Sequence, residues 1–294
     1  MTGERVLVLG ALHHDVVVDA PRLPAVDETL PGTGVDYRFG GKGGNQAVAA
    51  ARMGAEVSMA GRVGRDEAAL AILSTLDAVG VDRSLVLETD ASTGMSVAIT
   101  LPSGDYGAVI VSGANLENDG EVAFQEAPAT VLLQNEIPEA ANLALVRKLP
   151  QETRLIVNAA PARPMSDELG ARTDVLIVNR VEAEGMTGLA SPEDAVRALA
   201  EKVRGAVVLT RGADGALLAE GGQVAGYPTV PVTVVSTHGA GDMFTGALAA
   251  RLTAGHRLED ALSFAQAAAG LYVSLPIAQR DQISAAAVAG YLAY

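Results

Sequence analysis

Two glycine-rich segments, far apart along the chain, carry the residue types best suited to catalysis. The first, Phe39–Gln46, reads FGGKGGNQ, and the second, Thr237–Phe244, reads THGAGDMF. Each leads into a run of small residues that favours a helix, so each would offer free backbone N–H groups at a helix start. The first segment adds a lysine and an asparagine, and the second adds one carboxylate, Asp242. That combination suits a site that holds a polar substrate and stabilises a phosphoryl group during its transfer.

The second segment combines an anion-binding helix start with a candidate base. A strand is predicted over Val232–Ser236 and a helix over Gly241–Leu252, so the loop between them lies at a helix N-terminus, where the backbone dipole favours negative charge. Three residues of this loop would form an anion hole for the phosphoryl group: Gly239, Ala240 and Gly241. Asp242, in the first helical turn, could take the proton of an attacking hydroxyl. The alternative is an ordinary carboxylate that only stabilises the helix.

The first segment matches neither common phosphate-binding motif. A P-loop needs Gly-x-x-x-x-Gly-Lys-Ser/Thr, whereas Gly43 follows Lys42 and Asp36 occupies the place of the first glycine. A dinucleotide-binding fingerprint needs a third glycine where Gln46 stands. The segment therefore predicts a tight turn that a ligand can approach closely, with Asn45 binding a hydroxyl and Lys42 acting as a point charge. The alternative is a flexible turn in which Asn45 caps the following helix.

The overall composition predicts an acidic protein with an aliphatic core. The chain has 294 residues, enough for one large domain over 1–294, and 49% are hydrophobic whereas only 3% are aromatic. A net charge of −14 argues against a nucleic-acid or anionic-membrane partner, since both need clustered lysine and arginine. The sequence contains no cysteine, which excludes disulfides and thiolate metal sites and fits a cytoplasmic protein.

Two apolar stretches raise the question of targeting or membrane insertion. The short run that follows Arg5 is too short for a signal peptide. Residues 261–278 carry no charge, but Ser263, Gln266 and Pro276 interrupt them, and their alanine-rich half is typical of a buried helix. We therefore expect no membrane span.

Short aliphatic runs alternate with helical patterns along most of the chain. The runs predict strands buried on both faces of a parallel sheet: Val6–Leu9, Val57–Ala60, Val131–Leu133, Leu155–Val157, Val175–Val178 and Ala206–Thr210. The helical patterns are Asn45–Met53, Glu67–Val79, Glu139–Lys148, Pro192–Arg204, Gly241–Leu252 and Leu258–Val273. This alternation predicts a three-layer α/β fold, with a mostly parallel central sheet and helices on both faces.

Residues 12–39 and 94–112 break this rhythm. Both segments alternate apolar and polar residues, and 94–112 is typical of a hairpin with its turn at Pro102–Asp105. Together they could form a small antiparallel sheet that projects as a lid and excludes water from a site beneath it. The alternative is a β extension without a role in catalysis.

Five motifs, in order along the chain, give a resemblance to a known family. Gly40–Ala51 resembles the first signature of the ribokinase-like family of carbohydrate kinases, also called the PfkB family, in the form typical of its ribokinase branch. Gly239–Asp242, followed by Phe244, is similar to the second signature. Between them lie three further stretches that resemble family motifs: Asn158–Arg163, Asn179–Glu182 and Thr210–Gly215.

The resemblance implies a ribokinase-like fold and the ATP-dependent phosphorylation of a hydroxymethyl group on a small sugar, with Mg²⁺. It makes Asp242 the base and Gly239–Gly241 the anion hole. It places Asn179 near the phosphates, and Glu182 near the metal through water. It implies nucleotide contacts from Thr210, Gly212 and Gly215, and from Gln266 at the adenine end. It implies sugar contacts from Asp15, Gly41, Lys42, Asn45 and Glu136. The segments 12–39 and 94–112 would be the family's lid, which in many relatives also forms a homodimer interface.

Two departures from the family pattern bear on specificity. Ribokinases show Asn-x-Asp near the first strand, whereas this chain has His13-His14-Asp15. Asp15 is kept, but His13 puts a bulkier imidazole into the sugar site, so another sugar or a nucleoside is open as the substrate. A metal site made by His13 and His14 is disfavoured, because adjacent strand residues face opposite ways.

The second departure concerns a monovalent cation. Relatives carry Asp-Thr before the anion hole, and that aspartate helps to bind an activating cation, whereas this chain has Ser236-Thr237. The stretch Ser274–Arg280 also lacks the usual Gly-Ala pattern. Losing a carboxylate weakens a K⁺ site built from oxygen ligands, so we expect weak or absent K⁺ activation.

Two rival functions remain at this point. A nucleoside kinase of the same fold would need His13 and the lid to accommodate a base. A catalytically silent sugar-binding protein would keep the fold without the chemistry, and the intact Asp242 segment argues against it.

Overall fold

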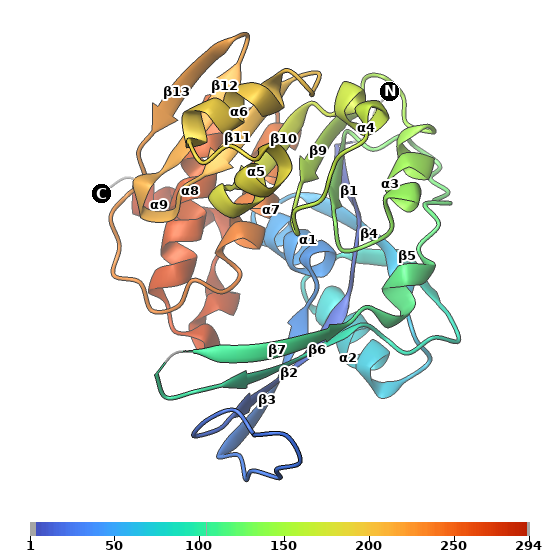
Figure 1. Cartoon of the computed structure of the whole chain (residues 1–294). Helices are drawn as coiled ribbons and strands as arrows, with labels where there is room; N and C mark the ends of the chain where they lie inside the picture. Colours follow the sequence, from blue (N-terminus) through green and yellow to red (C-terminus); the bar gives the residue numbers. More distant parts are fainter. Residues whose placement is uncertain (1–3, 104, 293–294) are drawn as a thin grey trace.

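A nine-stranded sheet forms the centre of the molecule in the computed structural model, which describes residues 4–103 and 105–292 (Figure 1). Its strand order is β13-β12-β11-β10-β9-β8-β1-β4-β5, and every neighbouring pair from β11 to β5 is parallel. The antiparallel strands β12 and β13 close one edge. The strands are β1 (Arg5–Leu9), β4 (Glu56–Val63), β5 (Asp82–Glu88), β8 (Thr130–Gln134), β9 (Arg154–Asn158), β10 (Val175–Asn179), β11 (Ala206–Thr210), β12 (Ala216–Glu220) and β13 (Gln223–Tyr227).

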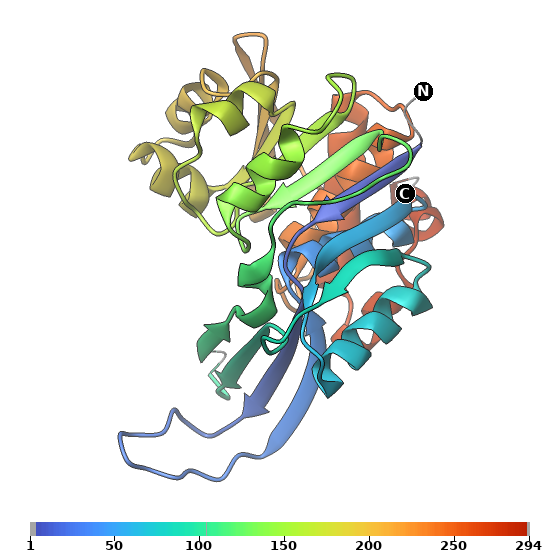
Figure 2. The ribbon, with the colours of Figure 1, turned by 90° about the vertical axis from the view of Figure 1, so that its right-hand side faces the viewer.

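Two layers of helices cover this sheet, one on each face (Figures 1 and 2). One layer contains α1 (Lys42–Arg52), α2 (Glu67–Ala78), α7 (Ala240–Thr253), α8 (Leu258–Ser274) and α9 (Ala285–Leu292). The other contains α3 (Glu139–Val146), α4 (Asp167–Arg172), α5 (Arg180–Thr187) and α6 (Pro192–Ala200). Short 3₁₀ helices lie at η1 (Gly113–Glu117), η2 (Gly212–Asp214) and η3 (Ile277–Gln282).

The aliphatic runs form strands because both of their faces are buried. In β1, Val6 and Val8 pack with the α1 layer, whereas Leu7 and Leu9 pack with the α3 layer. A strand that is apolar on both faces belongs in the interior of a parallel sheet. The six predicted strands and six predicted helices are all confirmed, and the three-layer α/β class with them, with ends that differ by a few residues.

A second, four-stranded sheet projects from the body (Figure 2). Its order is β3-β2-β6-β7, formed by β2 (His13–Asp19), β3 (Gly34–Gly40), β6 (Met95–Thr100) and β7 (Tyr106–Val111). The pairs β2/β3 and β6/β7 are antiparallel as predicted, but β2 and β6 pair in parallel. The fully antiparallel prediction was wrong there because both strands follow parallel strands of the main sheet, β1 and β5, and leave the body in the same direction. Gly104, in the predicted turn, lies outside the described residues.

One predicted strand does not exist. Val232–Ser236 joins neither sheet and bends at Val235, whose N–H donates to the carbonyl of Val273, near the end of α8, over 2.8 Å. A β-branched run favours extended backbone, but a strand also needs a partner with a free edge.

No helix among the described residues is both long enough and apolar enough to cross a bilayer.

Candidate active site

Polar residues gather where the parallel strands end. Four neighbouring strands finish on an amide or hydroxyl side chain: Gln134 in β8, Asn158 in β9, Asn179 in β10 and Thr210 in β11. Strand β1 lies between β4, which follows it in the main sheet on one side, and β8, which comes later in the chain and lies on the other side. Ligands of open α/β sheets bind at the carboxyl ends of the strands beside such a reversal.

Helices α1 and α7 meet closely above this edge. A Cβ added to Gly246 of α7 would lie 2.5 Å from the Cβ of Ala49 and 2.6 Å from the carbonyl oxygen of Gln46, both in α1. Only glycine permits that approach. It brings the first turns of the two helices together, and with them Asn45 and Asp242.

Asp242 is held in place by two amide side chains. It is 8% exposed, and its Oδ2 accepts a hydrogen bond from the Asn45 Nδ2–H over 3.1 Å. Its Oδ1 accepts one from the Gln46 Nε2–H over 2.9 Å. Asn45 is therefore not the predicted helix cap, because α1 starts at Lys42 and Gly41 is its N-cap. The carboxylate at this helix start does more than stabilise the helix, since its orientation is set by a separate element.

Sequence reasoning assigned no role to Gln46, which is the centre of a buried amide network. Its Nε2 also donates to Asn158 Oδ1 over 2.9 Å, and its Oε1 accepts from Gln134 Nε2 over 2.8 Å. The Gln46 side chain is fully buried. A glutamine in an otherwise alanine-rich helical face was the available signal, because a buried amide must find partners.

The chain enters α7 through the loop Ser236–Gly241, which we call the anion-binding loop after its predicted role. Gly239 adopts a φ of 80°, in the left-handed region that favours glycine. The Ala240 N–H donates to the Thr237 carbonyl over 3.2 Å, so it is not free as predicted. Among the described residues, the N–H groups of Gly241 and Asp242 have no acceptor. Of the three predicted donors only the Ala240 N–H is engaged, because the Gly239 N–H also has no acceptor among the described residues, and Asp242 adds a free donor that the sequence did not indicate.

Glu136 and Lys42 meet on the other side of Asp242. The Lys42 backbone N–H donates to Glu136 Oε2 over 2.7 Å. Burial raises the pKa of Glu136 to about 6, and the negative charges of Asp242 and Asp15 act in the same direction, while Lys42 opposes them. The structure thus brings Lys42, Glu136, Asp15 and Asp242 into one electrostatic neighbourhood.

Asn179 and Glu182, predicted to lie near the phosphates and the metal, are joined by two reciprocal hydrogen bonds. The Asn179 side chain accepts from the Glu182 N–H over 2.9 Å, and Glu182 Oε2 accepts from the Asn179 N–H over 2.8 Å. This reciprocal pair is a capping box at the start of α5. Burial raises the pKa of Glu182, which Lys42 opposes. One oxygen of Glu182 remains free of the capping bonds and can face a water or a metal ion.

Two adjoining cavities meet at the anion-binding loop. The smaller, of 190 Å³, is lined by Lys42, Asn179, Glu182, Gly241 and Asp242, among others. The larger, of 380 Å³, contains the predicted nucleotide residues Gly212, Gly215 and Gln266 and has an apolar wall that includes Val232 and Val234. Both share Thr210, Thr237, Ala240, Gly241 and Phe244. An apolar cavity that opens into a polar one suits a base joined to phosphates.

The remaining predicted sugar residues lie at the root of the projecting sheet. His13 is 4% exposed, its Nε2 has no partner among the described residues, and burial lowers its pKa. Asp15 Oδ1 accepts from the Ser96 N–H over 3.1 Å. A Cβ on Gly41 would lie 2.5 Å from the Ala11 carbonyl, so this glycine serves packing as well as ligand access. His14 stacks on Tyr37, with ring centroids 5.6 Å apart. None of these residues lines the two cavities at α7.

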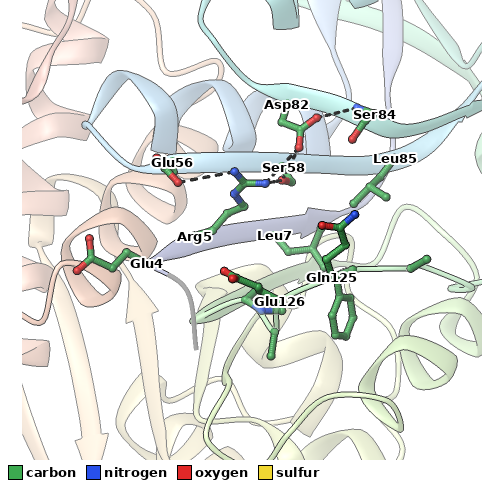
Figure 3. Close-up of a pocket in the computed structure, with 14 residues that line it drawn as sticks. Glu4, Arg5, Leu7, Glu56, Ser58, Asp82, Ser84, Leu85, Gln125 and Glu126 are labelled. Atoms are coloured by element: carbon green, nitrogen blue, oxygen red, sulfur yellow. Dashed lines mark hydrogen bonds and ion pairs between the residues drawn. The ribbon is translucent and has the colours of Figure 1, made fainter. Parts of the chain in front are cut away.

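A separate hollow of 540 Å³ lies at the opposite ends of the strands (Figure 3). Its one arginine, Arg5, is already engaged with Ser58, Asp82 and Glu56. The other charged side chains that line it are carboxylates, which would repel a phosphate. This hollow is large, but it offers no free group that could bind a phosphate. The smaller cavities at Asp242 are therefore the candidate active site.

The chain is similar to known carbohydrate kinases over most of its length. The sequence model of the pfkB family carbohydrate kinases matches residues 4–284. The ribokinase of Bacillus subtilis (strain 168) is 35% identical over 274 residues, which cover 91% of this chain and 92% of the relative. The ribokinase of Haemophilus influenzae is 31% identical, over 92% and 93% of the two chains. The structure of Arabidopsis thaliana ribokinase complexed with ribose and ATP superposes over the full length of both chains, with a TM-score of 0.92 and 28% identity.

Proposed function

Because the chain belongs to the pfkB family of carbohydrate kinases and is an ATP-dependent sugar kinase, we propose the following roles for its residues. A hydroxymethyl oxygen of a small sugar attacks the γ-phosphorus of ATP, and the bond from that phosphorus to the bridging oxygen breaks, which releases ADP. Asp242 takes the hydroxyl proton. The free N–H groups of Gly241 and Asp242 stabilise the charge that spreads over the phosphoryl oxygens.

The position of Asp242 carries this proposal. Its carboxylate borders both the cavity with the free helix-start N–H groups and the neighbourhood of Glu136 and Lys42. Two amides fix its orientation, and a carboxylate can accept about four hydrogen bonds, so lone pairs remain for an incoming hydroxyl. A base must lie within hydrogen-bond reach of the proton that it takes, and fixed orientation achieves that.

The sugar binds between α1 and the projecting sheet, which acts as its lid. Glu136, Asn45 and Asp15 accept from or donate to its hydroxyls, with Gly41 and Lys42 beside them. His13 is held neutral by its lowered pKa, so it offers one donor and one acceptor. Ribose is the first candidate, because the similar enzymes are ribokinases. His13 is the residue on which a preference for another sugar would depend.

ATP occupies the two adjoining cavities. Its base lies in the larger one between η2 and α8, beside Gly212, Gly215 and Gln266, and its phosphates pass Thr210 and Asn179 toward Gly241. Mg²⁺ prefers oxygen ligands and keeps several waters, and the free oxygen of Glu182 fits such water-mediated binding. When bound, the ion would neutralise phosphate charge. We expect the protein to act in the cytoplasm, and we propose that it forms a homodimer through the lid.

The test is ADP release with MgATP across a panel of pentoses, hexoses, keto-sugars and nucleosides. We expect turnover with a small sugar and a loss of about 10²–10⁴-fold in Asp242→Asn, the usual contribution of a positioned base. Asp260→Asn is the matched control, because Asp260 is an exposed carboxylate in the first turn of α8. Turnover only with nucleosides would support a nucleoside kinase. No turnover with any compound would support a silent binding protein, and an active Asp242→Asn would remove Asp242 as the base.

A further inference from the structure

Arg280, in η3, is a buried cation without a carboxylate partner. It is 4% exposed, and it makes no ion pair with any residue that the structure describes. Its guanidinium carbon lies 4.4 Å from the ring centroid of Tyr272. Burying a charge is costly unless dipoles replace the lost water. The groups that surround this guanidinium therefore indicate what it does.

Backbone carbonyl groups replace the water. Arg280 Nη2 donates to the Ser236 carbonyl over 2.7 Å, and Nη1 donates to the His238 carbonyl over 2.9 Å. Nε donates to the Leu275 carbonyl over 3.1 Å. Two of these three acceptors belong to the anion-binding loop Ser236–Gly241. The planar fork of an arginine can hold several acceptors at once in a fixed geometry.

The same contacts connect the loop to the rest of the site. The carbonyl oxygen of Arg280 accepts from Arg52 Nη1, at the end of α1, over 3.2 Å. The Tyr272 hydroxyl lies 2.9 Å from where a Cβ on Gly239 would be, so the loop also packs against the ring that carries the guanidinium. Arg280 thus joins the anion-binding loop to α1 and α8, and these are the elements that frame Asp242 and the nucleotide cavity.

We propose that Arg280 is a built-in monovalent cation that positions the anion-binding loop for phosphoryl transfer. The effect of Arg280 on catalysis rests on the proposed kinase function, whereas its contacts with the loop do not. Carbonyl oxygens are the ligands that a bound K⁺ would use, and here the guanidinium already satisfies two of them in the loop. The cation is tethered by the chain, so the loop needs none from solution. Arg280 is a positioning residue, because it acts through the loop and does not touch the reacting atoms.

The first test compares Arg280→Ala with the wild-type protein in steady-state kinetics. We expect kcat to fall and KM for MgATP to rise, with kcat/KM lower by about 10–100-fold, as for lost hydrogen bonds to a charged group, while KM for the sugar stays unchanged. Guanidinium or K⁺ added at millimolar levels should restore part of the activity of Arg280→Ala. The wild-type protein should turn over equally in K⁺ and in tetramethylammonium. A strong stimulation of the wild-type protein by K⁺ would overturn the proposal.

The second test does not depend on catalysis. Amide hydrogen exchange over residues 236–241 should be faster in Arg280→Ala, and calorimetry should show weaker binding of MgADP. Arg251→Ala is the matched control, since Arg251 also lies over an aromatic ring, Phe264, at 4.6 Å but touches no loop carbonyl. Unchanged loop exchange in Arg280→Ala would overturn the proposal, whether or not the wild-type protein phosphorylates a sugar. If Arg280→Ala does not fold, Arg280→Lys replaces it, and its loop should also exchange faster, because an ammonium cannot hold three carbonyls in the same plane.

Discussion

Asp242 takes its orientation from amide side chains and not from a second charged group. Asn45 and Gln46 each donate to a different oxygen of the carboxylate, and Gln46 is fixed in turn by Gln134. Amides hold the carboxylate without neutralising it. A lysine or arginine in their place would stabilise the ionised carboxylate and so make Asp242 a weaker base. Both side chains that hydrogen-bond to this carboxylate are therefore neutral amides.

Glu136 predicts a pH dependence of sugar binding. Burial raises its pKa to about 6, so the ionised form, which can accept from a sugar hydroxyl, is lost as pH falls through that value. We expect kcat/KM for the sugar to decline below about pH 6. In Glu136→Gln this inflection should be absent, and kcat/KM should be lower than in the wild-type protein above about pH 6, where the variant has a donor in place of one acceptor of the ionised carboxylate.

Burial of the ionised Glu136 also predicts a loss of folding stability at neutral pH. The folded pKa lies above the ordinary value of 4.5, so this contribution to stability is complete below pH 4.5 and is lost as pH rises through 6. Glu136→Gln should therefore be more stable than the wild-type protein at pH 8, by about 1–2 kcal/mol, and equally stable at pH 4. Urea denaturation at both pH values checks this, with the exposed Glu201→Gln as control. An equal change in stability at both pH values would contradict it.

At the scale of residues, the sequence suggested groups that could touch a ligand but gave no sign of the groups that hold them in place. Asp242 and Lys42 stand in recognisable motifs, because the chemistry dictates both their type and their spacing. Gln46 and Arg280 act through partners far along the chain, Asn158 and the carbonyl of Ser236. A side chain whose role depends on tertiary pairing has no local pattern, so a single sequence could not identify it.

At the scale of elements, the crossing of α1 and α7 decides the geometry of the site. The two helices pack closely because Gly246 offers no Cβ at their contact with Ala49. The packing places the first turn of one helix beside the first turn of the other. An aspartate and two amides that are far apart in sequence become neighbours through it.

Gly246→Ala should therefore damage activity as well as stability. The added methyl group would meet the Cβ of Ala49 at 2.5 Å, so α7 must shift away from α1, at a cost of about 1–3 kcal/mol. The shift would lengthen both hydrogen bonds to Asp242 and lower kcat. Gly290→Ala, in α9 with nothing within 4 Å of the new methyl group, should leave kcat unchanged and stabilise slightly. Thermal unfolding and steady-state kinetics of both variants measure this. A Gly246→Ala enzyme with normal kcat would contradict it.

Elements were predictable where burial on both faces sets the pattern. The strands of the parallel sheet and the long helices follow from their apolar runs. Val232–Ser236 has a strand-like composition, yet it pairs with no strand, and Val232 and Val234 line the larger cavity. The parallel pairing of β2 with β6 was also not predictable from local alternation, since it depends on where both strands leave the main sheet.

At the scale of the whole molecule, the projecting sheet has two different faces. His13 and Asp15 alternate with His14 along β2, so the first two share the face that carries the sugar residues. The other face carries an apolar row across all four strands, in which Tyr37, Val16, Val97 and Val109 lie opposite one another in register. Tyr37 is 62% exposed and Val109 67%. An exposed apolar row on a thin sheet is typical of a surface that a partner covers.

A second copy of the chain is the partner that we propose for this face, and its disruption is testable. Light scattering coupled to size exclusion should give the mass of a dimer for the wild-type protein at micromolar concentration. Val109→Asp should shift it to the monomer, because a carboxylate buried in the centre of an apolar interface has no partner charge. Val181→Asp is the matched control: Val181 is 76% exposed but lies on α5, away from the projecting sheet, so its dimer should persist. A monomeric wild-type protein, or a Val109→Asp variant that still forms the dimer, would show that the apolar row is not a dimer interface.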